Sequence, residues 1–232
     1  RNFEMSKTDI YIVGAARTAI GGFGGSLASL RPAELGEIAI REAIARSGLA
    51  ADQVQHVVLG NVIPSQPSDA YVARVAAVKA GVPVEAPAMT VNRLCGSGLQ
   101  AIVSAAQTLA LGEAEVAVGA GAESMSNAPH HMLKARHGQK LGDIAMLDAM
   151  LGALTDPFDD VHMGITAENV AERCAISRED QDALAVESHA RAAKAIKADY
   201  FKDQIVPVEI RTRKGITVFD TDEHVKPSTS ME

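Results

Sequence analysis

Short runs of β-branched and apolar residues alternate with longer helical patterns between Asp9 and Ser124, and few architectures accommodate this alternation. It is typical of βαβ units, in which the strands form a buried parallel sheet covered by helices. We therefore predict an α/β fold for this part of the chain. The predicted strands are Ile10 to Val13, Val54 to Leu59, Ala88 to Val91 and Val116 to Val118.

Three helices are predicted between these strands. The first begins near Pro32, because a proline at the first helical position loses no hydrogen bond. The second covers about Tyr71 to Ala80 and ends at Gly81. The third follows Cys95 and has apolar residues at the spacing of one helix face. The predicted apolar faces contain Leu35, Ile38 and Ala39 in the first helix and Leu99, Ile102, Val103 and Ala106 in the third.

The pattern changes after Ser124, and we place a boundary there between segments 1–124 and 125–232. The segment Met125 to Phe158 is rich in His, Gly and Met, which predicts an excursion from the sheet with short helices at most. A helix is predicted from Arg178 to Tyr200, because Ser177 and Asp180 resemble a capping box. Its predicted face contains Ala183, Val186, Ala190 and Ala193, and a hairpin with Lys214 and Gly215 at its turn follows.

Charge and cysteine content limit the function classes and the compartment. The 232 residues carry 22 basic and 29 acidic side chains, a net charge of −7 without a basic block, which argues against nucleic-acid binding. The most apolar region, Leu99 to Ala122, is interrupted by polar residues, so no membrane helix is predicted. Two cysteines in a chain with 47% hydrophobic residues favour a reducing, cytoplasmic setting over a disulfide framework.

The two ends of the sequence suggest a piece of a longer protein. Residues Arg1 to Glu4 precede Met5 and are expected to be a cloning remnant. The last residues, FDTDEHVKPSTSME, are polar and turn-like and contain no closing element. We expect a chain cut short.

Cys95 lies between a predicted buried strand and a predicted helix, and Gly96, Ser97 and Gly98 follow it. This places the sulfur over the free N–H groups of a helix N-terminus, where glycines let a substrate carbonyl approach. A helix terminus favours an anion by only about 0.3 to 1 kcal/mol, so attack also needs a positioned base, usually histidine. No motif places one of the seven histidines beside Cys95. The alternative is a small buried cysteine that lets the helix pack tightly, and the pattern leaves both open.

Several motifs resemble the thiolases, the acetyl-CoA C-acyltransferases, and most closely the bacterial β-ketothiolases that serve polyhydroxyalkanoate synthesis. They are AARTAIGGFGGSL, VNRLCGSGLQAIVSAAQTL, GAGAESMSNAPH, HMGITAENVAER and SREDQD, and the similarity runs from about Ile10 to Met231. The resemblance implies a βαβαβ nucleophile domain, begun in 1–124, with a loop domain inserted in it, to which 125–232 would largely belong. A second domain of like topology would be absent from this chain.

The resemblance also implies roles for individual residues. Cys95 would be the acyl-accepting nucleophile, with the first-turn backbone at Gly96 and Ser97 and the N–H of Cys95 itself forming an oxyanion site. Leu154, His162 and Met163 would line the pantetheine arm of coenzyme A, and Lys226 would lie beside its adenine end. Without the family, each of these four is an ordinary core residue, helix start or surface charge. Part of Met125 to Ala153 resembles a loop that joins dimers into tetramers.

Three motifs of the family are missing here: an Asn-Glu-Ala-Phe segment, a Gly-His-Pro segment with the activating histidine, and a Cys-x-Gly-Gly-Gly segment with a second cysteine. We therefore expect these 232 residues alone to be inactive. The implied reaction is thiolysis of 3-ketoacyl-CoA or condensation of two acetyl-CoA, in a homodimer or homotetramer active in fatty acid or polyhydroxyalkanoate metabolism.

Two other functions fit a similar fold. A condensing enzyme acting on a ketoacyl carrier protein would need an electropositive docking face, which the acidic composition does not favour. A non-catalytic scaffold would not require Cys95 in its full context. No cofactor is implied, since His130, His131 and His137 match no zinc-ligand spacing. Gly21 to Gly25 match no phosphate-binding motif and are expected to form a flexible or packing loop.

Overall fold

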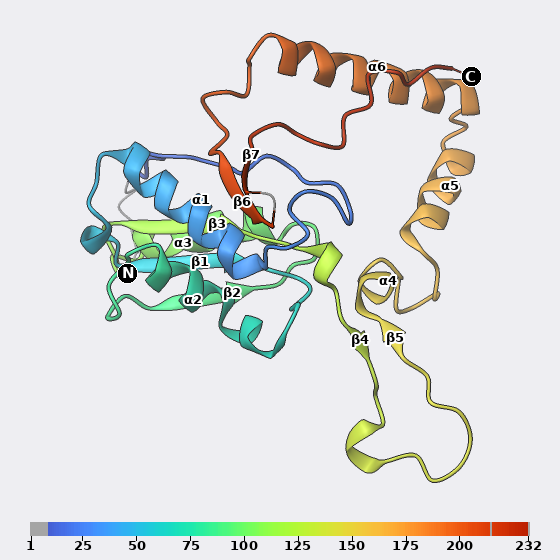
Figure 1. Cartoon of the computed structure of the whole chain (residues 1–232), viewed down its shortest axis with the longest axis horizontal. Helices are drawn as coiled ribbons and strands as arrows, with labels where there is room; N and C mark the ends of the chain where they lie inside the picture. The colour runs from blue at the N-terminus through green and yellow to red at the C-terminus, as the bar shows by residue number, and fades with distance from the viewer. Residues whose placement is uncertain (1–8, 214, 232) are drawn as a thin grey trace, which may run out of the picture.

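A parallel three-stranded sheet forms the centre of the protein, whose computed structural model describes residues 9–213 and 215–231 (Figure 1). The strand order is β2-β1-β3, and β1 pairs in parallel with both neighbours. The parallel sheet predicted from the sequence is confirmed. The strands are β1 (His56–Gly60), β2 (Ala88–Val91) and β3 (Ala117–Gly121).

Helices cover both faces of this sheet. α1 (Pro32–Ser47) and α2 (Val72–Lys79) pack on the face to which Val57 and Leu59 point, with Ile40, Ile44 and Val72 in the same buried cluster. α3 (Ser97–Ala110) packs on the opposite face, against Val58. Alternate residues of β1 point to opposite faces, and Val57 to Gly60 are all buried. β1 therefore has an apolar run instead of an alternating pattern. All three helices lie where the sequence predicts them.

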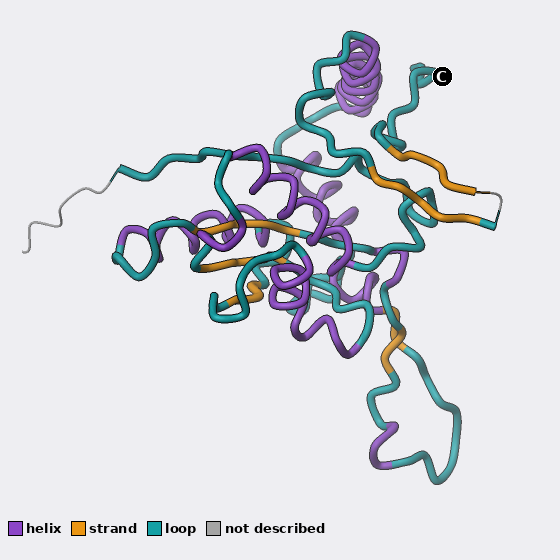
Figure 2. Tube along the Cα trace, turned by 60° about the vertical axis from the view of Figure 1, so that its left-hand side comes forward, coloured by secondary structure: helices purple, strands orange, loops and turns teal. Residues whose placement is uncertain are grey.

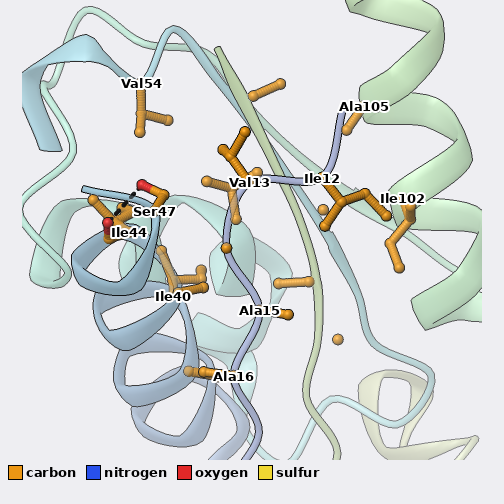
Figure 3. A pocket seen from close by; sticks show the side chains of 18 of the residues that line it. Ile12, Val13, Ala15, Ala16, Ile40, Ile44, Ser47, Val54, Ile102 and Ala105 are labelled. Carbon is orange, nitrogen blue, oxygen red and sulfur yellow. Dashed lines mark hydrogen bonds between the residues drawn. The ribbon is translucent and has the colours of Figure 1, made fainter. Parts of the chain in front are cut away.

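The predicted strand Ile10 to Val13 is wrong. This segment is extended but pairs with no described strand, and Tyr11 and Ile12 are 75% and 79% exposed. A cavity of about 560 Å³ separates it from β3 and reaches α1 and α3 (Figure 3). Its visible lining is almost wholly aliphatic, as the labelled Ile12, Val13, Ile40 and Ile102 show. An apolar run becomes a strand only if a neighbour pairs with it through hydrogen bonds, and no described strand does so here.

The apolar face predicted for α3 is not the face that packs on the sheet. Leu99 is 70% exposed, and Ile102 and Val103 are also exposed. The cause is the distance between helix and sheet, since Gly60, Gly119 and Gly121 let the helix backbone come so close that only small side chains fit. The buried residues of α3 are Ser97, Ala101, Ala105 and Thr108.

Residues after Ser124 leave the sheet, as predicted (Figures 1 and 2). β4 (His130–His131) and β5 (Leu147–Asp148) pair at the base of a long projecting loop, and α4 (Ala149–Ala153) follows. α5 (Met163–Arg173), not predicted as a helix, and α6 (Arg178–Lys197) form an arm beside the sheet domain (Figure 1).

The predicted start of α6 is confirmed, because Ser177 accepts a hydrogen bond from the N–H of Asp180. Its predicted apolar face is not buried, since Ala183 and Ala190 are exposed and Val186 and Ala193 are half-buried. None of the described helices is both long and apolar enough to cross a membrane.

The chain then returns to the sheet domain. The predicted hairpin is confirmed as β6 (Val208–Thr212) paired antiparallel with β7 (Gly215–Phe219). Gly215 has φ 124, a conformation that favours glycine. Val208 packs with Leu27 and Leu35 in a second apolar cluster. Lys214, the other predicted turn residue, and Arg1 to Met5 lie outside the described residues.

Candidate active site around Cys95

Cys95 lies in a turn between the end of β2 and the start of α3, and its side chain is exposed. Leu94, immediately before it, has φ 47, a left-handed conformation that costs a residue with a side chain about 1 to 3 kcal/mol. Two side chains hold this turn. Asn92 Oδ1 accepts from the Leu94 N–H at 3.0 Å, and Ser97 Oγ donates to the Leu94 carbonyl at 2.6 Å while accepting from the Arg93 N–H at 2.8 Å. The strained residue is thus fixed from both sides.

The backbone N–H groups around Cys95 differ in what they can offer an oxyanion. Those of Gly96 and Ser97 already donate to the carbonyls of Arg93 and Leu94, at 3.1 and 2.9 Å. No described residue accepts from the N–H of Cys95, Gly98 or Leu99. An N–H without a partner is the better oxyanion donor, so the geometry favours Cys95 itself over the predicted Gly96 and Ser97. The buried Ser97 instead holds the turn.

Three glycines at strand positions determine how close α3, and with it Cys95, lies to the sheet. A Cβ on Gly60 would be 2.5 Å from the carbonyl carbon of Ser97, and one on Gly119 would be 2.6 Å from Cα of Ile102. A Cβ on Gly121 would be 3.1 Å from Cα of Gly98. By contrast, nothing lies within 4 Å of a Cβ built on Gly98. The space beside the first turn of α3 is therefore open, as the sequence predicts, whereas tight packing occurs at glycines that the sequence analysis did not single out.

Glu123 lies two residues after β3 and binds the loop that follows β1. Its carboxylate accepts from the Asn61 side chain, the Val62 N–H and the Ile63 N–H at 2.9, 2.9 and 3.1 Å. Burial raises the pKa of Glu123 above its usual value, and these three hydrogen bonds oppose that rise. Glu123 lies in the motif GAGAESMSNAPH, and the sequence pattern predicts no role for it.

The predicted coenzyme A contacts fall into two groups. Leu154 and the pair His162 and Met163 lie together, because the Met163 N–H donates to the Leu154 carbonyl at 2.8 Å. His162 is the N-cap of α5 and accepts from the Gly164 N–H at 3.0 Å. Lys226 is on a different segment, where its N–H donates to Nδ1 of His189 in α6 at 3.2 Å. No hydrogen bond or salt bridge joins the two groups in the described residues.

Histidines do not assist Cys95 in this structure. Within residues 9–213 and 215–231, no side chain makes a hydrogen bond to Sγ of Cys95. Among the same residues, no group of three or more His, Cys, Asp or Glu is arranged to hold a metal ion, and His130 and His131 are exposed in β4.

The glycine-rich loop near the N-terminus binds a carboxylate of the protein itself. Glu223 accepts from the Gly22 N–H at 2.7 Å, from the Ser26 N–H at 3.1 Å and from Ser26 Oγ at 2.7 Å. A Cβ on Gly25 would be 2.3 Å from Oε2 of Glu223, so any other residue there would displace this carboxylate. Of the two predicted alternatives, a flexible loop or a packing loop, these bonds support the packing loop.

Asp222 makes the adjacent connection. It binds Arg17 through two hydrogen bonds of 2.8 and 3.0 Å and accepts from the Ile20 N–H at 2.9 Å. The Arg17 guanidinium lowers the pKa of Asp222, and hydrogen bonds from Ser26 and Gly22 lower that of Glu223. These contacts fix the segment that continues to Lys226.

Asp222→Asn is expected to lower the free energy of unfolding by about 1 to 2 kcal/mol at pH 7. Because the folded-state pKa is depressed, this stability is present above the unfolded pKa of about 3.9 and is lost as the pH falls through the lower folded value. Urea denaturation at pH 7 and pH 3 measures the difference. Asp182→Asn, which removes an exposed pair with Arg178, is the control and should have almost no effect at either pH. Equal losses in the two variants would contradict the prediction.

Comparison with known proteins identifies the family of the chain. The family model for the thiolase N-terminal domain matches residues 10–232. The chain belongs to the thiolase family. This thiolase chain is 59% identical over 224 residues to beta-ketothiolase BktB of Cupriavidus necator, covering 97% of this chain and 57% of that relative. It is 47% identical over 226 residues to an acetyl-CoA acetyltransferase of Pseudomonas aeruginosa, again covering 97% of the chain and 57% of the relative.

Solved thiolase structures confirm the expected fold class. The crystal structure of human mitochondrial 3-ketoacyl-CoA thiolase aligns with a TM-score of 0.92 and 40% identity, over 95% of this chain and 56% of that one. The acetyl-CoA acetyltransferase of Bacillus anthracis aligns with a TM-score of 0.91 and 41% identity. This thiolase chain thus spans about 57% of the length of the curated relatives it matches.

Proposed function

We propose that the protein is an acyl-CoA C-acetyltransferase in which Cys95 carries the acyl group. One observation carries the proposal: a chain of the thiolase family has an exposed cysteine at a helix N-terminus. The cysteine lies in a strained turn that hydrogen bonds from the Asn92 and Ser97 side chains hold in place. A nucleophile presented in this way has open space beside Gly98 for a thioester. The N–H of Cys95 is free to donate to the oxyanion that forms.

The reaction runs in two steps through a thioester. In the thiolytic direction, the Cys95 thiolate attacks the 3-keto carbon of a 3-ketoacyl-CoA and a C–S bond forms. The bond between C2 and C3 then breaks, and the acetyl-CoA carbanion takes a proton from an acid. The thiol of coenzyme A, deprotonated by a base, next takes the acyl group and frees Cys95. Synthesis from two acetyl-CoA is the reverse, and splitting the exchange predicts ping-pong kinetics.

Coenzyme A would lie along the two groups described above. Leu154 and Met163 offer apolar surface, and His162 a ring, to the pantetheine arm beside α5. Lys226 offers a positive charge at the adenine end, supported by the bond between its N–H and His189. These four assignments are proposals. At the oxyanion site we propose the N–H of Cys95 in place of Gly96 and Ser97, whose N–H groups donate to the carbonyls of Arg93 and Leu94. The reaction as written needs no metal or redox cofactor.

The setting of the enzyme is also proposed. The free cysteines 95 and 174 suit the cytoplasm. The exposed apolar residues Leu133, Leu141 and Met146 on the projecting loop support assembly into homodimers or homotetramers. The beta-ketothiolase relative supports a place in fatty acid or polyhydroxyalkanoate metabolism. The boundary between segments 1–124 and 125–232 stays a prediction. Residues of β6 and β7, which belong to the second segment, pack against Leu27 and Leu35 of the first.

Intact mass and peptide mapping after incubation with acetyl-CoA test the proposal. The whole natural polypeptide should gain one acetyl group on Cys95 and none on Cys174, which is equally free and exposed and is therefore an internal control. The 232 residues expressed alone should show no turnover, because no described side chain serves Cys95 as a base. An acetyl group on Cys174, or none on either cysteine of the whole polypeptide, would overturn the assignment.

A further inference from the structure

We propose that Glu123 is a positioning residue for Cys95, acting through the loop Asn61 to Ile63 and through Asn92. The inference rests on the proposed function, in which Cys95 is the nucleophile. In the described residues, Glu123 makes no hydrogen bond to Cys95 or to Gly98. Its effect is therefore indirect, and each contact in the path can be followed.

The path begins at adjacent strand ends. β1 and β3 are parallel and Gly60 is paired with Gly121, so the loops that leave both strands begin side by side. Glu123 reaches across this edge and accepts three hydrogen bonds from the loop after β1. Asn61, which is buried, also donates from Nδ2 to the Ala122 carbonyl at 3.0 Å. The loop after β1 is thus bound on its β3 side at three consecutive residues.

On its other side, the same loop contacts the turn from Asn92 to Ser97 that contains Cys95, here called the nucleophile turn. The Asn61 N–H donates to the Val91 carbonyl at 3.1 Å, at the end of β2. The Asn92 side chain donates to the Val62 carbonyl at 3.4 Å, and its Oδ1 accepts from the Leu94 N–H at 3.0 Å. Leu94 is the left-handed residue that precedes Cys95. A continuous series of hydrogen bonds therefore connects the Glu123 carboxylate to the residue next to the nucleophile.

The chemistry at position 123 calls for a carboxylate. Three N–H donors from two backbone groups and one amide converge on its two oxygens. A glutamine has one acceptor oxygen and an NH₂ group, so at least one donor would face another donor. Glutamine has almost the same size, so Glu123→Gln weakens the hold on the loop without opening a cavity.

The variants are made in the whole natural polypeptide. Glu123→Gln is expected to slow single-turnover acetylation of Cys95 by about 10- to 100-fold, the scale of a misplacement near 1 Å. KM for acetyl-CoA should change little, since no proposed coenzyme A contact is altered. Asn92→Ala breaks the path at its other end by removing an exposed side chain that bonds to both Val62 and Leu94. If both act on one path, the double variant should be no slower than the slower single variant.

Glu34→Gln is the matched control. Glu34 also accepts a backbone N–H, that of Arg31 at 2.9 Å, but it stands at the start of α1 with no bond to the nucleophile turn. This control should lower the melting temperature while leaving the acetylation rate unchanged. A Glu123→Gln enzyme that acetylates at the parent rate, or whose effect simply adds to that of Asn92→Ala, would overturn the positioning role.

Alkylation by iodoacetamide separates this inference from the proposed function. The rate at Cys95 relative to Cys174 measures the presentation of the thiol without any acyl-CoA. Glu123→Gln and Asn92→Ala should lower that ratio severalfold, and Glu34→Gln should not. If the parent protein is never acetylated but the ratio still falls, the proposed function fails and the positioning role stands. An unchanged ratio overturns the positioning role.

Discussion

Replacing Cys95 with alanine is expected to lower acetyl-CoA acetyltransferase activity by at least about 10³-fold, because the covalent route is lost and only binding remains. Steady-state thiolysis of a 3-ketoacyl-CoA, followed as loss of the substrate, measures the effect on the whole natural polypeptide. The variant should also lose the acetyl adduct in its intact mass. Because Cys95 is exposed and its Sγ makes no hydrogen bond in the described residues, the free energy of unfolding should change by less than about 0.5 kcal/mol.

Cys174→Ala is the matched control for this loss. Cys174 is the C-cap residue of α5, free and exposed like Cys95, but it follows a helix instead of preceding one. Its replacement should leave both turnover and the acetyl adduct unchanged. Activity that survives in Cys95→Ala and disappears in Cys174→Ala would reverse the assignment of the nucleophile.

The position of Cys95 between a strand and a helix could be predicted because that signal is local, whereas its role as nucleophile came from the thiolase resemblance and stays a proposal. A β-branched run, a cysteine and two glycines before a helical pattern are all contained within about ten residues. The same holds for β2, predicted from Ala88 to Val91 and found there, and for the start of α6, where Ser177 binds the N–H of Asp180. In each case the forces that decide the structure act between near neighbours.

The wrong predictions arise from contacts between residues that are far apart in the sequence. Ile10 to Val13 has a strand composition, yet a strand needs a hydrogen-bonded neighbour, and the segment faces a cavity instead. The buried face of α3 was mispredicted because Gly60 and Gly119, far away in the sequence, set how close the helix lies to the sheet. Glu223 binds Gly22 across 201 residues, a contact that no local pattern contains. The periodicity of apolar residues predicts whether a segment is a helix or a strand, whereas the elements packed against it determine which of its faces is buried.

Gly60→Ala is expected to lower both the stability and the acetylation rate strongly, because Gly60 allows α3 to pack closely on the sheet. The new Cβ would lie 2.5 Å from the carbonyl carbon and 2.6 Å from the carbonyl oxygen of Ser97, and both atoms are backbone. Since no side chain can turn away to relieve this contact, the first turn of α3 must shift. Such overpacking should lower the free energy of unfolding by about 1 to 3 kcal/mol. Cys95 moves with the turn, so acetylation should slow by about 10²-fold or more.

Gly98→Ala separates packing from catalysis at the same turn. Apart from neighbouring backbone of the same helix, no atom lies within 4 Å of the new Cβ. Alanine is favoured over glycine in helices, so stability should hold or rise by up to about 1 kcal/mol. If the open space receives the thioester, however, acetylation should still slow, with a rise in KM that Gly60→Ala need not show. Thermal unfolding and single-turnover acetylation of the two variants give the comparison. Since the variant is expected to be stable, slower acetylation in Gly98→Ala cannot be attributed to unfolding. Unchanged acetylation would show that the substrate approaches Cys95 from another side.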